Sequence, residues 1–254
     1  MDFSLVPIAK ENFANLIYIG LGVSKKAMVA LFSTKGNTMV KESLANDLNI
    51  EYIDTDYIEG KFKRAKLDRL LIGGLVLENV PILVGRDELF NLGKDASGNT
   101  FPADFILGWN IISRYSWRGS LREGKLEVQT SDFVKNKSPK ANQPIINVEI
   151  GGEIFKVILD SSRPLSTIST RVEKKLIASN EEVKNTMDLL EDDQISYMGR
   201  LNFKIDNKSV SLSNCQVDKN IDQKDFDLIF GADLLRQTRW AIFGPMNFVR
   251  LENY

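Results

Sequence analysis

The stretch DFILGWNIISRYSWRGSLREGKLEV, residues 104–128, returns later in the chain as DLIFGADLLRQTRWAIFGPMNFVRL, residues 227–251. The two stretches align without a gap, and the alignment pairs similar residues: Gly108 with Gly231, Trp117 with Trp240, Leu126 with Val249, and Val128 with Leu251. A stretch that recurs in this way is the sequence signature of a repeated structural unit. The fold is therefore expected to contain one unit twice.

Two further blocks recur upstream in the same order. LVLENVPILV (75–84) resembles VSLSNCQV (210–217), and NLIYIGLGVSKKAMVALFSTKGNTMV (15–40) resembles NVEIGGEIFKVILDSSRPLSTIS (147–169). Between the halves lies the polar, proline-ending stretch QTSDFVKNKSPKANQP, which is typical of a linker. We therefore predict an N-terminal lobe over 1–133, a linker over 134–144 and a C-terminal lobe over 145–254.

Most of the chain has the pattern of β-strands. Apolar and polar residues alternate, or β-branched residues run together, in short stretches bounded by Gly and Asn. The pairs Gly73–Gly74 and Asp206–Asn207 lie where hairpin turns belong. Short helices are predicted at 40–48, 110–115, 170–178, 180–193 and 233–238. The fold class is therefore all-β with a few short helices.

Composition excludes several kinds of chemistry. The 254 residues include no histidine and one cysteine, Cys215, so histidine catalysis, histidine metal sites and multi-cysteine zinc sites are excluded. We expect no metal and no cofactor. The formal net charge of −1 favours no nucleic-acid partner.

The sequence also bears on location. No run of 18 apolar residues occurs, so no membrane span is predicted. The first residues lack the basic and apolar regions of a signal peptide. We expect a soluble protein, which would be secreted or periplasmic if a leader has already been removed, and the compartment stays open.

Two apolar runs at matched places in the halves end in small polar residues. VALFST (29–34) ends with Ser33 and Thr34, and VILDSS (157–162) contains Asp160. A carboxylate at the end of an apolar strand is unusual because burying an unpaired charge is costly. Asp160 is therefore the candidate site residue, unless it only caps the turn that follows.

Each half resembles the retropepsin unit of aspartic proteases. VILDSSRPLSTIS resembles the Asp-Thr/Ser-Gly element of that family, and FILGWNII and LIFGADLL resemble its Ile-Leu-Gly element, with Gly108 and Gly231 as the glycines. The resemblance covers nearly the whole chain. It implies a two-lobed acid-protease-like fold, with flap hairpins near 52–63 and 194–199 and an active site between the lobes.

The resemblance also implies roles for the two short runs. Asp160 matches one catalytic aspartate, and Thr34 and Ser161 match the hydroxyls that tie the two loops together. In the family, two carboxylates share a proton around one water, and one acts as base while the other acts as acid. Ser33 stands at the place of the second carboxylate and cannot share that proton. Where the family has glycine, this chain has Lys35 and Ser162, and an ammonium near Asp160 works against a shared proton.

These departures lead to one leading hypothesis and two alternatives. The leading one is a weak or inactive aspartic-protease-like protein that binds an extended peptide or protein segment in the interlobe cleft. The first alternative is an active aspartic endopeptidase that uses Asp160 with a second carboxylate, from Asp54, Asp56 or another chain. The second is a purely structural or assembly module whose cleft is closed. Because both units are present in one chain, we predict a monomer.

Overall fold

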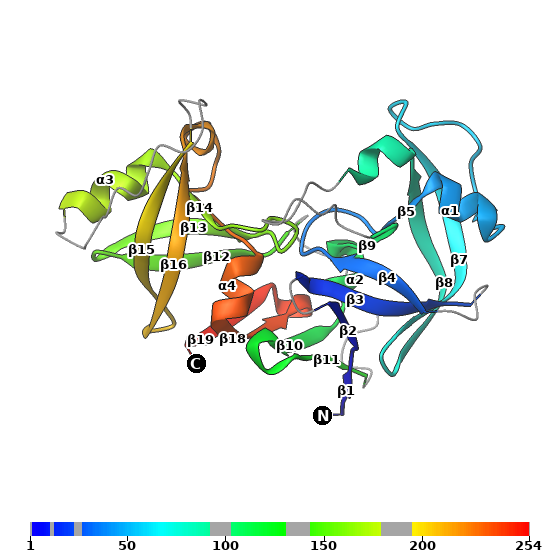
Figure 1. Cartoon of the computed structure of the whole chain (residues 1–254), viewed down its shortest axis with the longest axis horizontal. Helices are drawn as coiled ribbons and strands as arrows, with labels where there is room; N and C mark the ends of the chain where they lie inside the picture. Colours follow the sequence, from blue (N-terminus) through cyan, green and yellow to red (C-terminus); the bar gives the residue numbers. More distant parts are fainter. Residues whose placement is uncertain are drawn as a thin grey trace.

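The computed structural model describes residues 2–10, 13–22, 27–91, 103–130, 143–178 and 195–253. In these residues the protein is mostly β-sheet, arranged as two β lobes with a third sheet between them (Figure 1). The helices are short, and α3 (Thr170–Ala178) is the longest described one. The prediction of a mostly β protein with two lobes is confirmed.

The N-terminal lobe is a curled eight-stranded sheet in the order β2-β3-β4-β9-β5-β8-β7-β6, closed in part by pairing of β3 with β7. Its strands are β2 (Ile8–Lys10), β3 (Phe13–Leu21), β4 (Ala27–Phe32), β5 (Met39–Lys41), β6 (Glu51–Tyr52), β7 (Phe62–Ile72), β8 (Leu75–Gly85) and β9 (Phe105–Leu107). Its helical segments are α1 (Glu42–Asp47), η1 (Asp87–Phe90) and α2 (Trp109–Ile112).

The C-terminal lobe is a closed six-stranded barrel in the order β12-β13-β17-β14-β16-β15. Its strands are β12 (Ile145–Ile150), β13 (Glu153–Leu159), β14 (Thr167–Ile168), β15 (Ile195–Ile205), β16 (Lys208–Asp218) and β17 (Leu228–Phe230). Its other helical segments are η3 (Lys219–Gln223) and α4 (Ala232–Gln237).

The same pairing scheme is present in both lobes. In the first, β4 pairs with β9 in parallel, β9 with β5 antiparallel, and β5 with β8 in parallel. In the second, β13, β17, β14 and β16 make the same three pairings with the same directions. The repeat in the sequence therefore corresponds to a repeated arrangement of strands.

A five-stranded sheet joins the lobes, in the order β1-β11-β10-β18-β19 (Figure 1). Its strands are β1 (Phe3–Leu5), β10 (Ser116–Ser120), β11 (Lys125–Gln129), β18 (Thr238–Phe243) and β19 (Phe248–Asn253), with η2 (Leu121–Glu123) and η4 (Gly244–Met246) in its hairpins. The central contact is the antiparallel pairing of β10 with β18, one strand from each half.

The matched tryptophans lie in this joining sheet. Trp117 and Trp240 are both buried, as their repeat positions predict, and the Phe32 ring packs 5.1 Å from the first and 6.1 Å from the second, between centroids. Trp109, which has no aromatic counterpart in the other half, is also buried. All three tryptophans therefore belong to the core.

Local sequence signals explain several element boundaries. The predicted hairpin turns are present between β7 and β8 and between β15 and β16, with positive φ at Gly73, Asp206 and Asn207. The helix predicted over 170–178 is α3, whereas that predicted over 180–193 lies outside the described residues. The predicted linker, 134–144, falls between the end of β11 at Gln129 and the start of β12 at Ile145. Most of it lies outside the described residues.

Candidate functional site

Two loops, one from each lobe, hold the residues that the sequence singles out. In each half a central strand ends and its next residue is held by the neighbouring strand: the Ser33 amide donates to Leu107 O (2.9 Å), and the Asp160 amide donates to Phe230 O (2.8 Å). Both residues are buried, with 4% and 2% of their surface exposed. Ser33 and Asp160 therefore occupy equivalent positions at the ends of β4 and β13.

The next residue of each loop binds the opposite loop through its hydroxyl. Thr34 Oγ1 donates to Leu159 O (2.8 Å) and accepts from the Ser161 amide (2.9 Å). Ser161 Oγ donates to Phe32 O (2.7 Å) and accepts from the Thr34 amide (3.0 Å). We call these four bonds the hydroxyl grip. They are reciprocal and buried, and they tie the two lobes together where the loops meet.

The carboxylate of Asp160 has partners from both loops. Oδ1 accepts from the Ser162 amide (3.2 Å) and from the Ser162 hydroxyl. Oδ2 lies 3.5 Å from the Lys35 ammonium, whose side chain is 55% exposed. The lysine at the third position of the first loop therefore reaches the single acid of the second loop.

Ser33 binds within its own loop. Its hydroxyl donates to Lys35 O (3.2 Å) and accepts from the Lys35 amide (3.4 Å). This is the counterpart of the Asp160 bond to the Ser162 amide. The chain reverses at the following residue, Gly36, whose φ of +67° belongs to the left-handed region that favours glycine.

A second pair of repeated bonds supports the loops, and the sequence reading missed it. In the first half, the Thr38 amide and hydroxyl donate to Asn110 Oδ1 (2.7 and 2.8 Å), and the Thr38 hydroxyl accepts from the Gly108 amide (3.0 Å). The repeat could have revealed these hydrogen bonds, because Asn110 and Asp233 each stand two residues after one of the matched glycines.

In the second half, Ser166 and Asp233 occupy these places. The Ser166 amide and hydroxyl donate to the Asp233 carboxylate (2.9 and 2.7 Å), and the hydroxyl accepts from the Gly231 amide (2.9 Å). Burial raises the pKa of Asp233 above its ordinary value, against the opposing effect of the Ser166 hydrogen bonds. The first half has a neutral amide at the same place.

The matched glycines are needed for close packing. A Cβ on Gly108 would lie 2.3 Å from the backbone carbon of Asn37, and one on Gly231 would lie 2.7 Å from that of Leu165. Each glycine therefore lets a helix start press against the loop that follows the strand end. Asn15 adds a contact that the sequence did not indicate, because its Nδ2 donates to Ser161 O (2.7 Å).

The stretch predicted as the first flap, 52–63, lies at the hairpin tip between β6 and β7. Of the second predicted flap, 194–199, the structure describes the last five residues, which belong to β15. Tyr57 and Lys63 both donate to the Glu42 carboxylate (2.7 and 2.8 Å), and the bond from Lys63 contributes most to lowering the pKa of Glu42. Asp54 is half-exposed and lies 3.6 Å from Arg64, and Asp56 is exposed. The tip is thus bound to α1.

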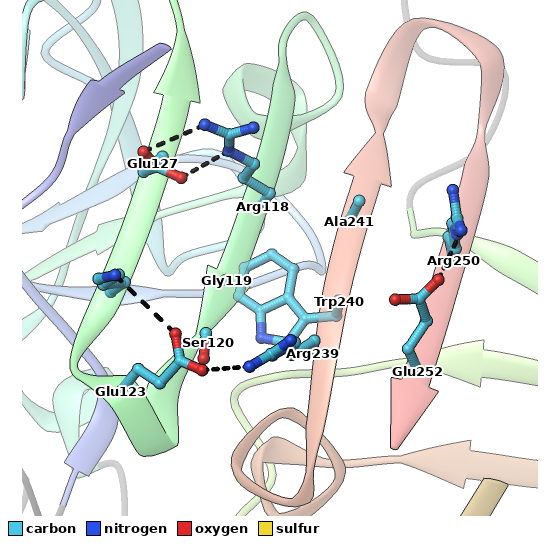
Figure 2. Close-up of a pocket in the computed structure, with 11 residues that line it drawn as sticks. Arg118, Gly119, Ser120, Glu123, Glu127, Arg239, Trp240, Ala241, Arg250 and Glu252 are labelled. Carbon is cyan, nitrogen blue, oxygen red and sulfur yellow. Dashed lines mark hydrogen bonds and ion pairs between the residues drawn. The ribbon is translucent and has the colours of Figure 1, made fainter. Parts of the chain in front are cut away.

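A hollow of about 550 Å³ lies on the joining sheet (Figure 2). It is crossed by the ion pairs Arg118–Glu127, Arg239–Glu123 and Arg250–Glu252. Such neighbouring charges on a sheet face stabilise one another modestly and are common on solvated strands. We regard this hollow as a solvated face.

The described residues hold neither a cluster of metal-binding side chains nor a membrane-spanning helix. No three acidic or cysteine side chains in them are grouped closely enough to hold a metal ion. No helix among them has the length and apolar character needed to cross a bilayer.

A scan against protein-family models matches no family to this chain, and a search of curated proteins returns no significant match. The function is therefore inferred from the residues and their geometry.

Proposed function

We propose that this protein is a non-cleaving relative of the two-lobed aspartic proteases and that it binds an extended peptide or protein segment between its lobes. Three observations support the proposal. The same strand pairing occurs in both lobes, a reciprocal hydroxyl grip joins the two loops, and an aspartate lies buried at one of the two matched strand ends.

The contact of Lys35 with Asp160 is the observation that carries the inactive part of the proposal. Hydrolysis by this family needs two carboxylates around one water, so that one takes a proton while the other gives one. Here the matched position holds the Ser33 hydroxyl, and an ammonium lies 3.5 Å from the remaining carboxylate. A serine hydroxyl and a lysine ammonium do not reproduce a proton-sharing pair of acids.

A second hollow supports the binding part. A pocket of about 250 Å³ lies beside the first loop and is lined by Asn37, Thr38, Ile53, Arg64, Ala65, Pro81, Ile82, Leu83 and Asn110. Much of this lining is apolar, and Ile53 is 57% exposed. An extended peptide could place an apolar side chain there while its backbone bonds to neighbouring loops.

Cleavage and binding are tested together with one peptide library. We expect no cleavage above background from acidic to neutral pH, with Asp160→Asn as the control that reports any contaminating protease. The same library, labelled and screened by fluorescence anisotropy, is expected to yield peptides that bind. Cleavage that disappears in Asp160→Asn would overturn the inactive part, and a library without a single binder would overturn the binding part.

The active-endopeptidase alternative receives less support from the described residues. It needs a second carboxylate facing Asp160. Asp54 lies on the hairpin tip beside Arg64, and Asp56 is exposed on the same tip. The positions of these two carboxylates therefore favour a protein that binds peptides without cleaving them.

A further inference from the structure

The two loops carry an unusual set of charges for a site built on this plan. Residues 33–36 contain one cation, Lys35, and residues 160–163 contain one acid, Asp160, and one further cation, Arg163. A pair of loops that would hold two acids in an aspartic protease thus holds one acid and two cations. The local formal charge is +1 in place of a negative one.

Strand register places Thr167, the hydrogen-bond partner of Arg163, on the same side of the C-terminal lobe as Asp160. Residues paired directly across a sheet point to the same face, and side chains two apart along a strand do likewise. Ile158, Ile229 and Thr167 are paired in succession across β13, β17 and β14, so they share one face. Asp160 follows Ile158 by two residues, so it emerges toward this face.

The guanidinium of Arg163 is held on this same face. Its Nη1 donates to Thr167 Oγ1 (3.3 Å), which leaves most of the guanidinium donors for other partners. Among the described residues, the side-chain partner of Arg163 is Thr167 and not a carboxylate, and Arg163 is half-buried. An arginine fork held in this way is suited to a planar carboxylate.

Lys35 also retains binding capacity. An ammonium has three donors, and its contact with Asp160 Oδ2 is a long one of 3.5 Å. Asp160 Oδ1 is already bonded by the amide and hydroxyl of Ser162. The 55% exposure of the Lys35 side chain leaves room for a second anion.

We infer that the peptide bound between the lobes presents a carboxylate to Lys35 and Arg163. This inference rests on the proposed peptide-binding function and names the chemistry of the ligand. The carboxylate is either the C-terminus of the peptide or the side chain of an Asp or Glu. Replacing the second catalytic acid by serine and adding a lysine thus converts a hydrolytic site into one that binds an anion.

The test begins with binders selected from the random peptide library. Each is resynthesised with a free C-terminal carboxylate, with a C-terminal amide, and with its Asp and Glu changed to Asn and Gln. We expect removal of the decisive carboxylate to weaken binding about tenfold or more, the usual loss for one charge-assisted pair. The amide arm identifies a C-terminal carboxylate, and the Asn and Gln arm identifies a side-chain carboxylate.

Variants of the protein supply the matching half of the test. Lys35→Gln and Arg163→Gln should each weaken binding of the carboxylate peptides about tenfold and change binding of their neutral versions little. Asp160→Asn should have the opposite sign and tighten binding severalfold, because it removes a like charge. Lys174→Gln, which removes an exposed cation from α3, is the control for net charge and should change nothing.

The outcomes separate this inference from the function on which it rests. Peptides that bind equally well with and without their carboxylates would overturn the inference and leave peptide binding intact. The same holds if Lys174→Gln weakens binding as much as Lys35→Gln does. A library that yields no binder at all would overturn both. Melting curves of each variant show whether an observed loss of peptide binding comes from unfolding. If it does, Asp160→Asn decides: tighter binding of the carboxylate peptides supports the inference, and unchanged or weaker binding overturns it.

Discussion

The loops around Ser33 and Asp160 share one backbone plan but differ in chemistry. Each begins at a strand end whose next residue is held by the neighbouring strand, and each contributes one hydroxyl to the reciprocal grip. They differ at the residue before the grip, Ser against Asp, and at the residue after it, Lys against Ser. Both loops thus contribute to the buried hydrogen bonds that join the lobes, whereas the side chains on either side of the grip residues differ.

The physical reason lies in the cost of each change. Loss of a grip hydroxyl would leave a buried amide and a buried carbonyl without partners, which is expensive. Loss of one of two facing carboxylates relieves a repulsion between like charges. The Ser33 hydroxyl meanwhile finds partners within its own loop. Under the proposed function, the side chains beside the grip can therefore change while the hydrogen bonds that join the loops remain intact.

The largest expected effect comes from making the first loop resemble an active one. Ser33→Asp with Lys35→Gly introduces a second acid and removes the cation, so peptide cleavage at acidic pH should rise at least about a hundredfold above background, in the range typical of general acid–base catalysis. The readout is cleavage of the peptide library, and Ser162→Gly is added if the double variant stays silent. Ser33→Asp alone should do less because Lys35 would pair with the new carboxylate.

The same variant makes a prediction about stability and pH. Two facing carboxylates raise the pKa of the pair, so one proton is bound more tightly in the folded state than in the unfolded state. Stability is then lost as pH rises through that raised pKa. The double variant should be more stable relative to its parent at mildly acidic pH than at neutral pH. A folded variant without cleavage and without this acid stabilisation would mean that Ser33 does not face Asp160.

The next effect concerns the shared part of the two loops. Thr34→Val and Ser161→Ala each remove two buried hydrogen bonds of the grip. Each should lower the free energy of unfolding by roughly 2–4 kcal/mol, measured by urea denaturation. The double variant should cost less than the sum because the four bonds are coupled. Additive losses would mean that the two hydroxyls act independently.

A smaller effect distinguishes the two side chains that accept the supporting hydrogen bonds, Asn110 in the first half and Asp233 in the second. Because burial raises the pKa of Asp233, its contribution to stability is greatest below the ordinary value of 3.8 and is lost as pH rises through the raised pKa. Asp233→Asn should remove this pH dependence from the free energy of unfolding. Asn110→Asp should add a similar one. Parallel curves for parent and Asp233→Asn would count against a raised pKa.

The smallest expected effect is that of dilution on the molecular mass of the protein. Because β10 of one half pairs with β18 of the other within one chain, the two units already supply each other's partner. We expect a monomer by light scattering at micromolar concentration, with no change of mass on dilution. A stable dimer would change the comparison of the loops, since two Asp160 residues could then meet across chains.

Much of the architecture could be predicted from the repeat. Gly108 and Gly231, and likewise Trp117 and Trp240, recur at matched positions, the hairpin turns have local signals, and periodicity identifies several of the strands. The equivalence of Ser33 and Asp160 followed from the same alignment, and the structure places both at matched strand ends. These features were predictable because each is encoded by neighbouring residues or by comparison of the two halves.

What the sequence alone determined is the mainly β character, the doubled plan, two of the hairpin turns, and the absence of histidine chemistry. Only the tertiary structure decided which loop atoms meet: that Lys35 reaches Asp160, that Asn15 bonds Ser161, and that Arg163 turns back onto Thr167. Asn15 and Ser161 are separated by 146 residues, and no local pattern records such a contact. Contacts between distant segments depend on how the lobes pack, because a side chain finds its partner only after the strands are in register.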